Sequence, residues 1–347
     1  MVAQGLWRSH GDDPQEAVRH LTAMQAQEHS YARWSVAQRA GMPLGVRAID
    51  RAFDEGRILR THVLRPTWHY VAPQDLDWLM KLSGPRVHAR NARGYAALGL
   101  GAKVLARTSD IIAKAVDGAP QTRKDIAAIL ERKGISVAGQ RIAYILMHAE
   151  LHAMICSGPM RKKQHTYAAF YDRVPRATGP EGDDALAHLA LRFFTTRGPA
   201  TLTDFVWWSG LGTADARRAL EVAGSRLVSR PVDSRTYWFA EQTVPRVSPA
   251  VDLVQCFDEA IISYSQTRDI LQTRLAAFPV PRHIDGFTHV VLLDGRLLGH
   301  WRPVQHRESL SVETRIQKNL NRREKIALAD AIDRYVAFAE APPARSK

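Results

Sequence analysis

The spacing of apolar and polar positions repeats one pattern three times along the chain. In each repeat, stretches with helical apolar spacing are followed by an apolar, strand-like run and then by a second strand that contains threonine followed by an aromatic residue. These second strands contain Thr67-Trp68-His69-Tyr70, Thr166-Tyr167 and Thr236-Tyr237-Trp238-Phe239. Two helices followed by a β-hairpin are the elements of a winged helix, a unit that lays a helix and a hairpin on a nucleic-acid duplex. The repetition predicts tandem copies of this unit.

Local signals place the helices of these units. Pro14-Gln15-Glu16 starts the first helix, whose buried face is predicted to consist of Ala17, Val18, Leu21 and Met24. Thr122 and Thr201 are predicted N-caps of the helices that open the second and third units. The predicted recognition helices of the first two units run from Val46 to Glu55 and from Gly139 to Leu151.

The pattern changes to strands near residue 250. Asp294-Gly295 separates two apolar runs and predicts a hairpin, and a closing helix is predicted from Val312 to Phe338. Arg315, Lys318, Arg322 and Lys325 fall on one face of that predicted helix. The sequence therefore predicts an α+β protein with tandem winged-helix repeats and a C-terminal β-barrel. The expected regions are winged helix 1 (1–72), a helical connector (73–118), winged helix 2 (119–175), winged helix 3 (183–245) and the β-barrel with its closing helix (250–340).

The net charge extends this prediction to the partners of the chain. The 347 residues include 48 Lys and Arg against 35 Asp and Glu, which gives a formal charge of +13 and a pI near 10.0. Such a surplus attracts polyanions at long range and favours DNA or RNA binding through counterion release. An alternative is a basic protein from a genome in which arginine is frequent, because charge is evidence about partners and not about fold.

The composition also excludes several classes of protein. Cys156 and Cys256 are the only cysteines, so neither a disulfide framework nor a zinc ribbon is expected. No run of about 18 uncharged apolar residues occurs, and residues 1–27 hold no apolar core of signal-peptide length. We expect a cytoplasmic protein that associates with the nucleoid and makes no contact with a membrane, and a monomer is the expected state.

Two glutamines are the strongest candidates for chemistry. Gln25 and Gln27 lie in Met24-Gln25-Ala26-Gln27-Glu28, where the first helix is expected to end. Within a helix, residues two apart point about 200° away from each other, so the pair converges only at a frayed or turned end. A glutamine cannot remove a proton, but its amide both donates and accepts hydrogen bonds. Two of them can hold a water molecule and a sugar or base edge together; alternatively, both face solvent at a helix end.

Segments spread over residues 15–335 share the features of one known family. They are Leu21-Thr22-Ala23-Met24-Gln25-Ala26-Gln27, Leu59-Arg60-Thr61-His62-Val63-Leu64-Arg65-Pro66-Thr67-Trp68-His69, Gly139-Gln140-Arg141, Cys156-Ser157-Gly158-Pro159, Lys163-Gln164-His165-Thr166-Tyr167, Gly198-Pro199-Ala200-Thr201, Asp204-Phe205 and Trp207-Trp208-Ser209-Gly210-Leu211. These segments resemble the AlkZ/YcaQ family of winged-helix DNA glycosylases. The resemblance implies tandem winged helices and a β-barrel around a DNA-binding cleft.

The same resemblance implies that Gln25 and Gln27 are catalytic. The family signature is Gln, an apolar residue, then Gln or Asp, and the Gln-Gln form resembles the branch that unhooks interstrand crosslinks. Ala26 is shorter than the apolar residue usual at this position, and the motif holds no carboxylate to activate water. The implied enzyme is a monofunctional DNA glycosylase for alkylated, N7-substituted purines. Alkylation makes such a purine a cationic leaving group, so positioning and charge stabilisation can supply much of the acceleration.

Candidate DNA-binding residues follow along two hairpins. Arg60 lies on the first strand of the first hairpin, and i, i+2 spacing puts Arg65, Thr67 and His69 on one face of the second. These residues either line the floor of a cleft beside the glutamines or hydrogen-bond to neighbouring helices. The expected tip of the second hairpin carries Lys162, Lys163, Gln164 and His165, which favour phosphate contacts, and Arg141 is a further candidate.

No metal site or cofactor is predicted. His148 and His152 have i, i+4 spacing, but the glutamate between them, Glu150, is not next to the first histidine as a metalloprotease motif requires. Residues 94–101 lack the spacing of a phosphate-binding loop. Trp207 and Trp208 are expected in the core rather than on a base-stacking platform.

Two functions remain open at this point, and both have double-stranded DNA as the partner. One is the glycosylase, acting on DNA with alkylated bases. The other is a non-catalytic winged-helix protein such as a transcriptional regulator, whose recognition helices should carry residues that read base edges. The helix from Val46 to Glu55 offers Arg47 and Arg51, but also Asp50, Asp54 and Glu55. Those acidic residues would repel phosphates, which favours the enzyme.

Overall fold

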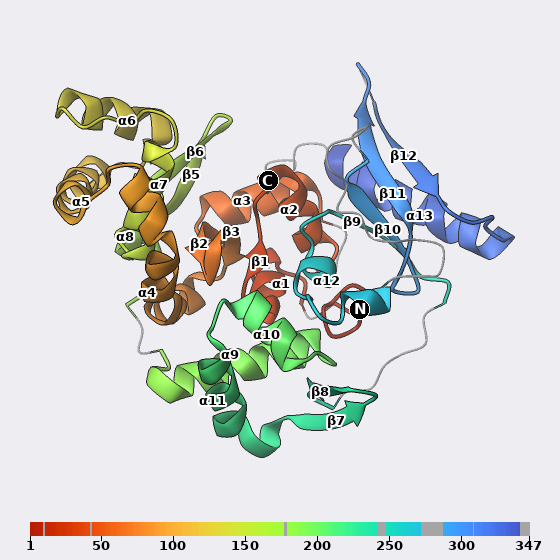
Figure 1. The fold of residues 1–347 in the computed structure, drawn as a ribbon. Helices are drawn as coiled ribbons and strands as arrows, with labels where there is room; N and C mark the ends of the chain where they lie inside the picture. The colour runs from red at the N-terminus through yellow and green to blue at the C-terminus, as the bar shows by residue number, and fades with distance from the viewer. Residues whose placement is uncertain are drawn as a thin grey trace.

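The computed structural model describes residues 1–9, 11–41, 44–176, 179–241, 248–271, 287–307 and 309–340. Within these ranges the chain forms a mixed fold of helices and four small antiparallel sheets. The first unit lies at the centre, with the second unit and the C-terminal sheet on opposite sides and the third unit below (Figure 1). The expected regions 183–245 and 250–340 both include residues outside the described ranges. None of the described helices is long and apolar enough to cross a bilayer.

The first unit consists of three helices and a three-stranded sheet. Its elements are α1 (Pro14–Leu21), β1 (Met24–Gln25), α2 (His29–Ala37), α3 (Val46–Asp54), β2 (Leu59–Val63) and β3 (Arg65–Val71), with strand order β1-β3-β2. Asp13 caps α1 by accepting from the backbone N–H of Gln15. The predicted hairpin is confirmed, whereas β1 was not predicted from the sequence.

The prediction that Met24 continues the first helix is wrong. The helix α1 ends at Leu21, and Thr22 adopts a left-handed backbone conformation with φ 67°. Met24 then pairs with Tyr70 on β3, so its buried side chain belongs to a strand. Apolar spacing could not separate these alternatives, because a buried residue just beyond a helix can continue the helical spacing by coincidence.

The connector and the second unit form one compact group. Its elements are α4 (Pro73–Ala97), α5 (Ala102–Val116), β4 (Gln121–Thr122), α6 (Arg123–Arg132), α7 (Arg141–Leu151), β5 (Ile155–Arg161), β6 (Gln164–Ala169) and α8 (Phe170–Arg173). Thr122 caps α6 in a reciprocal capping box with Asp125, as predicted. The apolar core of this group includes Ile126, Leu130 and Ile145.

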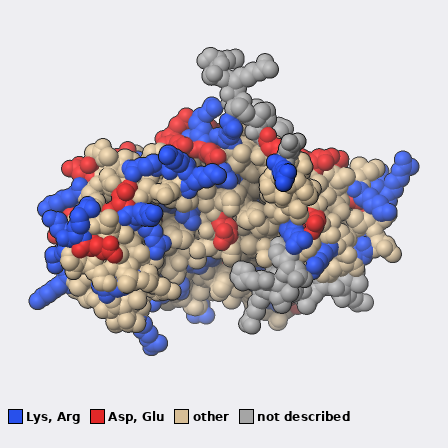
Figure 2. Space-filling view, turned by 90° about the horizontal axis from the view of Figure 1, so that it is seen from above, with Lys and Arg blue, Asp and Glu red and all other residues tan. Residues whose placement is uncertain are grey.

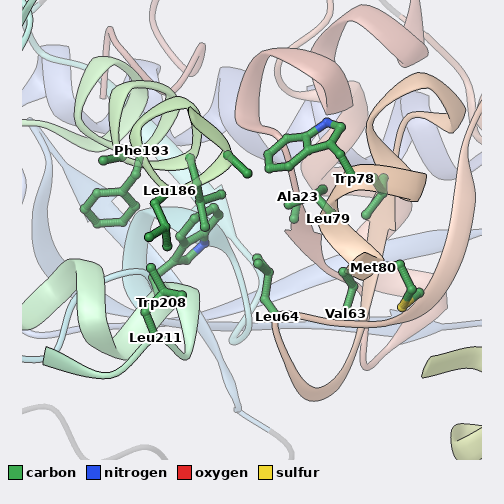
Figure 3. Close-up of a cluster of buried hydrophobic side chains, with 14 of the residues drawn as sticks. Ala23, Val63, Leu64, Trp78, Leu79, Met80, Leu186, Phe193, Trp208 and Leu211 are labelled. Atoms are coloured by element: carbon green, nitrogen blue, oxygen red, sulfur yellow. The ribbon is translucent and has the colours of Figure 1, made fainter. Parts of the chain in front are cut away.

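The third unit packs against the tip of the first hairpin. Its elements are α9 (Gly182–Arg197), α10 (Leu202–Ser209), α11 (Thr213–Ala223), a 3-10 turn (Gly224–Arg226), β7 (Val228–Val232) and β8 (Arg235–Phe239). Thr201 caps α10 as predicted. At Gly210, where φ is +71°, an added Cβ would lie 2.4 Å from the Leu64 carbonyl oxygen. Figure 3 shows Val63 and Leu64 in the same apolar cluster as Trp208 and Leu211. The first hairpin tip is therefore buried and cannot act as an exposed wing.

The C-terminal region is an open sheet with one long helix. Its elements are β9 (Val251–Val254), α12 (Glu259–Ile262), a 3-10 turn (Arg268–Leu271), β10 (His289–Leu293), β11 (Arg296–Gln305), β12 (Leu310–Ile316) and α13 (Arg322–Glu340). The strand order is β12-β11-β10-β9, and no closed barrel forms among the described residues. The hairpin at Asp294-Gly295 is confirmed.

The predicted helix from Val312 to Phe338 is wrong in its first part. Residues 310–316 pair with β11 as a strand, and the helix starts only at Arg322, after Asn321 and Glu324 exchange hydrogen bonds in a capping arrangement. Arg315 lies on the strand and Lys318 lies before the helix, so the proposed basic face does not exist as one helical face.

The apolar core of the first unit is continuous with that of the third unit and with that of the C-terminal sheet. One buried cluster joins its hairpin to α4 and to the third unit, and includes Leu59, Leu79 and Phe193. A second cluster joins its helices to the C-terminal sheet and α13, and includes Trp34, Trp301 and Tyr335. Ala23 belongs to the first cluster, and Met24 and Ala26 belong to the second. The segment that carries the two glutamines therefore runs between the two clusters.

Candidate functional site

Gln25 lies on the short strand β1 and Gln27 at the bend that leads into α2, so neither residue is on the end of α1. Gln25 pairs with His69 on β3, and the backbone N–H of Ala26 donates to the Trp68 carbonyl oxygen at 2.7 Å. Ala26 is fully buried, while both glutamines are partly exposed. Both predicted residues therefore lie partly open to solvent on the short stretch from β1 to α2, and their joint catalytic role stays a prediction.

Arg65 fixes the side chain of Gln25. Its Nη2 donates to Gln25 Oε1 at 2.9 Å, and its Nη1 donates to the Trp208 carbonyl oxygen at 3.1 Å. Burial lowers the pKa of Arg65 to about 10, so the guanidinium stays charged at neutral pH. Because the carbonyl oxygen of the Gln25 amide is occupied by Arg65, its amide NH2 group is left to donate to a ligand.

His69 forms a hydrogen bond with Arg65 and so helps to hold its guanidinium group. Its Nδ1 lies 2.9 Å from the Thr67 carbonyl oxygen, which can only accept, so Nδ1 carries the proton. The unprotonated Nε2 then accepts from Arg65 at 3.3 Å. Burial, followed by the charge of Arg65, lowers the pKa of His69 to about 3. The buried hydroxyl of Thr67 has no partner among the described residues. His69 therefore acts here as a neutral acceptor.

Arg60 holds the same segment from the other side. Its Nε donates to the Ala26 carbonyl oxygen at 2.9 Å and its Nη2 to the Gln27 carbonyl oxygen at 3.3 Å. The guanidinium also lies 4.3 Å from the ring centroid of Trp68. The backbone N–H of Arg60 donates to the hydroxyl of Ser157 on β5, at 2.8 Å. Arg60 and Arg65 therefore lie beside the glutamine segment and hydrogen-bond to the protein, and their contact with DNA stays a prediction.

Glu259 is a site residue that the sequence argument missed. Its Oε1 accepts from the backbone N–H of Gln25 at 2.8 Å. Its Oε2 accepts from Arg197 Nη2 at 2.6 Å, Ser263 Oγ at 2.6 Å and Trp208 Nε1 at 2.9 Å. The carboxylate is 1% exposed. Nothing in the local sequence of Glu259 could have linked it to Gln25, since only tertiary folding brings α12 next to β1.

The charge state of Glu259 follows from this network. Burial opposes ionisation, but the charge of Arg197 and the hydrogen bonds from Ser263 and Arg197 outweigh it and lower the pKa of the carboxyl to about 2. A carboxylate with such a low pKa and no solvent exposure is a poor general base. Glu259 therefore positions Gln25 and does not remove a proton from water.

The second hairpin exposes part of the predicted basic tip. Lys162, Lys163 and Gln164 are exposed at the turn between β5 and β6. His165 instead packs its ring against His29, with ring centroids 4.6 Å apart. Seen from above, lysines and arginines are numerous over the left part of the molecule, where Figure 1 places the second unit, with some acidic side chains among them (Figure 2). A phosphate contact at this tip would therefore fall to the two lysines and Gln164.

The remaining recognition candidates are occupied by internal contacts. Arg141 donates to the carbonyl oxygens of Ser136 and Leu98, which join the start of α7 to the end of α4. On α3, Asp50 forms a 2.7 Å ion pair with Arg33, and Asp54 accepts from the backbone N–H of Met160 on the second hairpin. The hairpin β5–β6 thus reaches across to α3 (Figure 1).

The two tryptophans have different environments. Trp208 is fully buried, as expected from the sequence. Trp207 is 50% exposed, although its indole N–H donates to the Ile262 carbonyl oxygen at 2.9 Å. Its own carbonyl oxygen lies 3.4 Å from Arg65 Nη1, so Trp207 is near the Gln25 side chain. This exposure contradicts the expectation that both tryptophans lie in the core.

One buried histidine, His69, and two partly buried ones, His29 and His165, make stability depend on pH. Burial is the main cause that lowers the pKa of His29 to about 2, of His69 to about 3 and of His165 to about 4. In the unfolded chain these groups bind a proton below about pH 6.5, whereas in the folded chain they stay neutral. The free energy of unfolding should therefore fall as the pH drops from about 6.5 toward 4.

Urea denaturation between pH 7.5 and 5 measures this effect. Each such histidine contributes a slope of up to about 1.4 kcal/mol per pH unit below pH 6.5. His69→Gln should lower the slope of the unfolding free energy against pH by up to about 1.4 kcal/mol per pH unit, which corresponds to one proton. An unchanged slope would mean that His69 is protonated in the folded protein.

Comparisons with known proteins place this fold. A family model described as DNA glycosylase AlkZ-like matches residues 18–338. Among solved structures, the DNA glycosylase AlkZ of Streptomyces sahachiroi matches with a TM-score of 0.76 and 20% sequence identity, over 98% of this chain and 94% of that chain. No curated protein matches the chain in sequence. The family match spans nearly the whole chain and confirms the resemblance seen in the sequence: the chain belongs to the DNA glycosylase AlkZ-like family.

Proposed function

We propose that the chain is a monofunctional DNA glycosylase that hydrolyses the N-glycosidic bond of N7-alkylated purines, including those in interstrand crosslinks. The observation that carries the proposal is the pair Gln25 and Gln27, two partly exposed neutral amides two residues apart on the stretch from β1 to α2. Three side chains hold that segment. Arg60 donates to two of its carbonyl oxygens, Arg65 donates to the side chain of Gln25, and Glu259 accepts from the backbone N–H of Gln25. Such fixed donors and acceptors are suited to orienting a reacting water molecule.

The two amides have different hydrogen-bonding capacity. The amide of Gln25 is oriented by Arg65, which leaves its NH2 group as a donor to the sugar or the base edge of the lesion. The amide of Gln27 has no hydrogen-bond partner among the described residues, so it can both accept from and donate to water. We assign the positioning of the attacking water to Gln27 and the positioning of the damaged nucleotide to Gln25.

A neutral pair suffices only for an activated leaving group. Alkylation at N7 gives the purine a positive charge, and departure of the base neutralises that charge. The nearby carboxylate, Glu259, is saturated with hydrogen bonds and has a pKa of about 2, so it supplies no proton acceptor at neutral pH. Positioning of water and lesion is then the main contribution of the protein to the rate. Undamaged purines, whose leaving groups are neutral, should remain untouched.

We further propose that residues 1–72, 119–175 and 183–245, each built of helices and a hairpin as a winged helix is, surround the DNA, with the buried hairpin of residues 1–72 serving as a packing element and not as a wing. The alternative, a regulator that reads sequence, needs an exposed recognition helix. Most of α7 is buried, including Ile145, Leu146 and Ala149, and α3 is tied to the second hairpin through Asp54. Neither helix is free to enter a major groove, which favours the enzyme. The exposed lysines at the second hairpin then contact phosphates without reading bases.

Base release from a defined lesion tests the activity. A duplex with one N7-methylguanine is incubated with excess protein, treated with alkali and resolved on a gel. Cleavage at the lesion, and none in the matched undamaged duplex, is the expected result. Strand cleavage before alkali would contradict the monofunctional assignment, and intact lesion DNA after prolonged incubation would contradict the glycosylase.

DNA binding should be electrostatic and insensitive to sequence. The logarithm of the binding constant should fall linearly with the logarithm of salt concentration, with a slope of about −0.9 for each neutralised phosphate. Lys162→Glu with Lys163→Glu should flatten that slope, measured by fluorescence anisotropy from 50 to 200 mM salt. Lys103→Glu with Lys114→Glu on α5 is the matched control.

Two outcomes would revise this view of DNA binding. An unchanged slope in the hairpin variant would remove the second hairpin from the interface. Strong preference for one duplex sequence over others of equal length would support the regulator.

A further inference from the structure

Three histidines from α4 and α7 lie together in the group formed by the connector and the second unit. His88 lies on α4, His148 on the last turn of α7, and His152 at the C-cap of α7. One ring nitrogen from each lies within 4.8 Å of the others. The sequence shows only the pair on α7, because His88 is brought to it by the packing of α4 on α7. The prediction that no ligand set for a metal exists therefore has to be revised.

The hydrogen bonds of the three rings all involve Nδ1, which leaves Nε2 of each ring to bind a ligand. Nδ1 of His88 lies 3.1 Å from the Tyr95 hydroxyl, and Nδ1 of His148 lies 3.5 Å from the hydroxyl of Ser109 on α5. Nδ1 of His152 lies 3.1 Å from the His148 carbonyl oxygen, which requires a proton on that nitrogen. In metal sites, ligating histidines typically donate from one ring nitrogen to such a partner and bind the metal with the other.

His88 supplies an independent indication of a ligand. Its Nε2 is buried and has no hydrogen-bond partner among the described residues. A buried polar atom without a partner is costly and uncommon, so its presence calls for an explanation.

We propose that His88, His148 and His152 bind one divalent transition-metal ion of the zinc type, which fastens α7 to α4. Imidazole nitrogens suit zinc, copper or nickel, whereas magnesium and calcium prefer oxygen ligands. Three histidines leave a fourth tetrahedral position for water, and His152 is exposed, so an ion can enter from solvent. Zn–N bonds of about 2.0–2.1 Å place ligand nitrogens roughly 3.3 Å apart, so the ring nitrogens need to close in by at most about 1.5 Å.

Glu150 has a different role, although it lies between the two histidines in sequence. Its carboxylate is buried against His62 Nδ1 on β2, so it serves the contact between α7 and the first hairpin. With Glu150 engaged there, the cluster lacks the carboxylate that a hydrolytic zinc site uses as a general base. The metal is therefore assigned a structural role, distinct from the glutamine site.

Binding of Zn²⁺ by the full-length protein tests the proposal. The protein is treated with EDTA, dialysed, and titrated with ZnCl2 in a calorimeter, with bound zinc counted after gel filtration. We expect one Zn²⁺ per chain and an increase in Tm that Mg²⁺ does not reproduce. His152→Ala and His88→Gln should each weaken Zn²⁺ binding at least tenfold and remove the increase in Tm. Substitution by Co²⁺ should give the visible absorption of a tetrahedral site in the parent only.

The variants separate this site from adventitious binding. His152 is exposed, so its replacement should not impair folding, and His306→Ala is the matched control at an exposed histidine elsewhere. The control should bind Zn²⁺ as the parent does. The proposal is overturned if the parent binds less than about one tenth of an equivalent. It is also overturned if His152→Ala keeps the affinity and the Tm response of the parent.

Discussion

Replacing either glutamine of the pair by alanine should slow base release by ~10-fold or more, which corresponds to at least about 1.4 kcal/mol of the activation barrier. Gln25→Ala removes the proposed donor to the lesion, and Gln27→Ala removes the group proposed to position water. Both side chains are partly exposed, so both variants should melt within a few degrees of the parent and bind lesion DNA nearly as tightly. Single-turnover release of base from an N7-methylguanine duplex is the measurement.

Controls distinguish a catalytic pair from a solvated segment. Gln74→Ala removes an exposed amide from α4 and should leave the rate unchanged. If the double variant Gln25→Ala, Gln27→Ala releases base at the parental rate, the assignment of the site is wrong. Loss of lesion binding in parallel with the rate would instead mean that the pair recognises the lesion and does not act on the chemical step.

The dependence of the rate on pH tests the neutral mechanism. Between pH 5 and 9 neither glutamine titrates, and His69 with a pKa of about 3 and Glu259 with a pKa of about 2 keep one charge state. The parental rate should therefore show no acidic limb from a carboxylate in this range. Gln27→Asp introduces a carboxylate and should introduce such a limb. A limb near pH 6 in the parent would point to a general base that the assigned site does not contain.

The second large effect is expected at Glu259. Glu259→Gln leaves the Arg197 guanidinium buried without a counter-charge, and loss of one partner of a buried ion pair costs about 3–5 kcal/mol of folding free energy. The pKa of this carboxyl is lowered in the folded protein, so its contribution is present above the unfolded pKa near 4.3 and is lost as the pH falls toward 2. The parent and the variant should therefore differ most at neutral pH in urea denaturation and converge in acid.

A matched pair of variants tests whether Glu259 also positions Gln25. Glu259→Gln keeps an oxygen that can accept from the Gln25 N–H, whereas Glu259→Ala removes it. At a temperature where all proteins are folded, base release should decrease in the order parent, Glu259→Gln, Glu259→Ala. Glu131→Gln, at an exposed carboxylate on α6, should change neither stability nor rate. Equal rates for the parent and Glu259→Ala would restrict Glu259 to a role in folding.

Much of the fold could be predicted because its signals are local. The helix starts at Thr122 and Thr201, and the Asp294-Gly295 turn, depend on residues a few positions apart. The three hairpins were likewise visible as apolar runs separated by turn residues. The segment from Val312 to Ile316 was misassigned, although its β-branched residues at alternate positions favour a strand.

The glutamine pair illustrates the boundary between sequence and structure. The sequence by itself supplied two neutral amides two residues apart, and the family resemblance pointed to them. Only the tertiary structure decided how Gln25 is held, since it pairs with His69 on another strand and its side chain accepts from Arg65. The support of the pair by Glu259 and the addition of His88 to the histidines of α7 have the same origin. Such contacts join residues far apart in sequence, and spacing along a chain reports only on neighbours within one element.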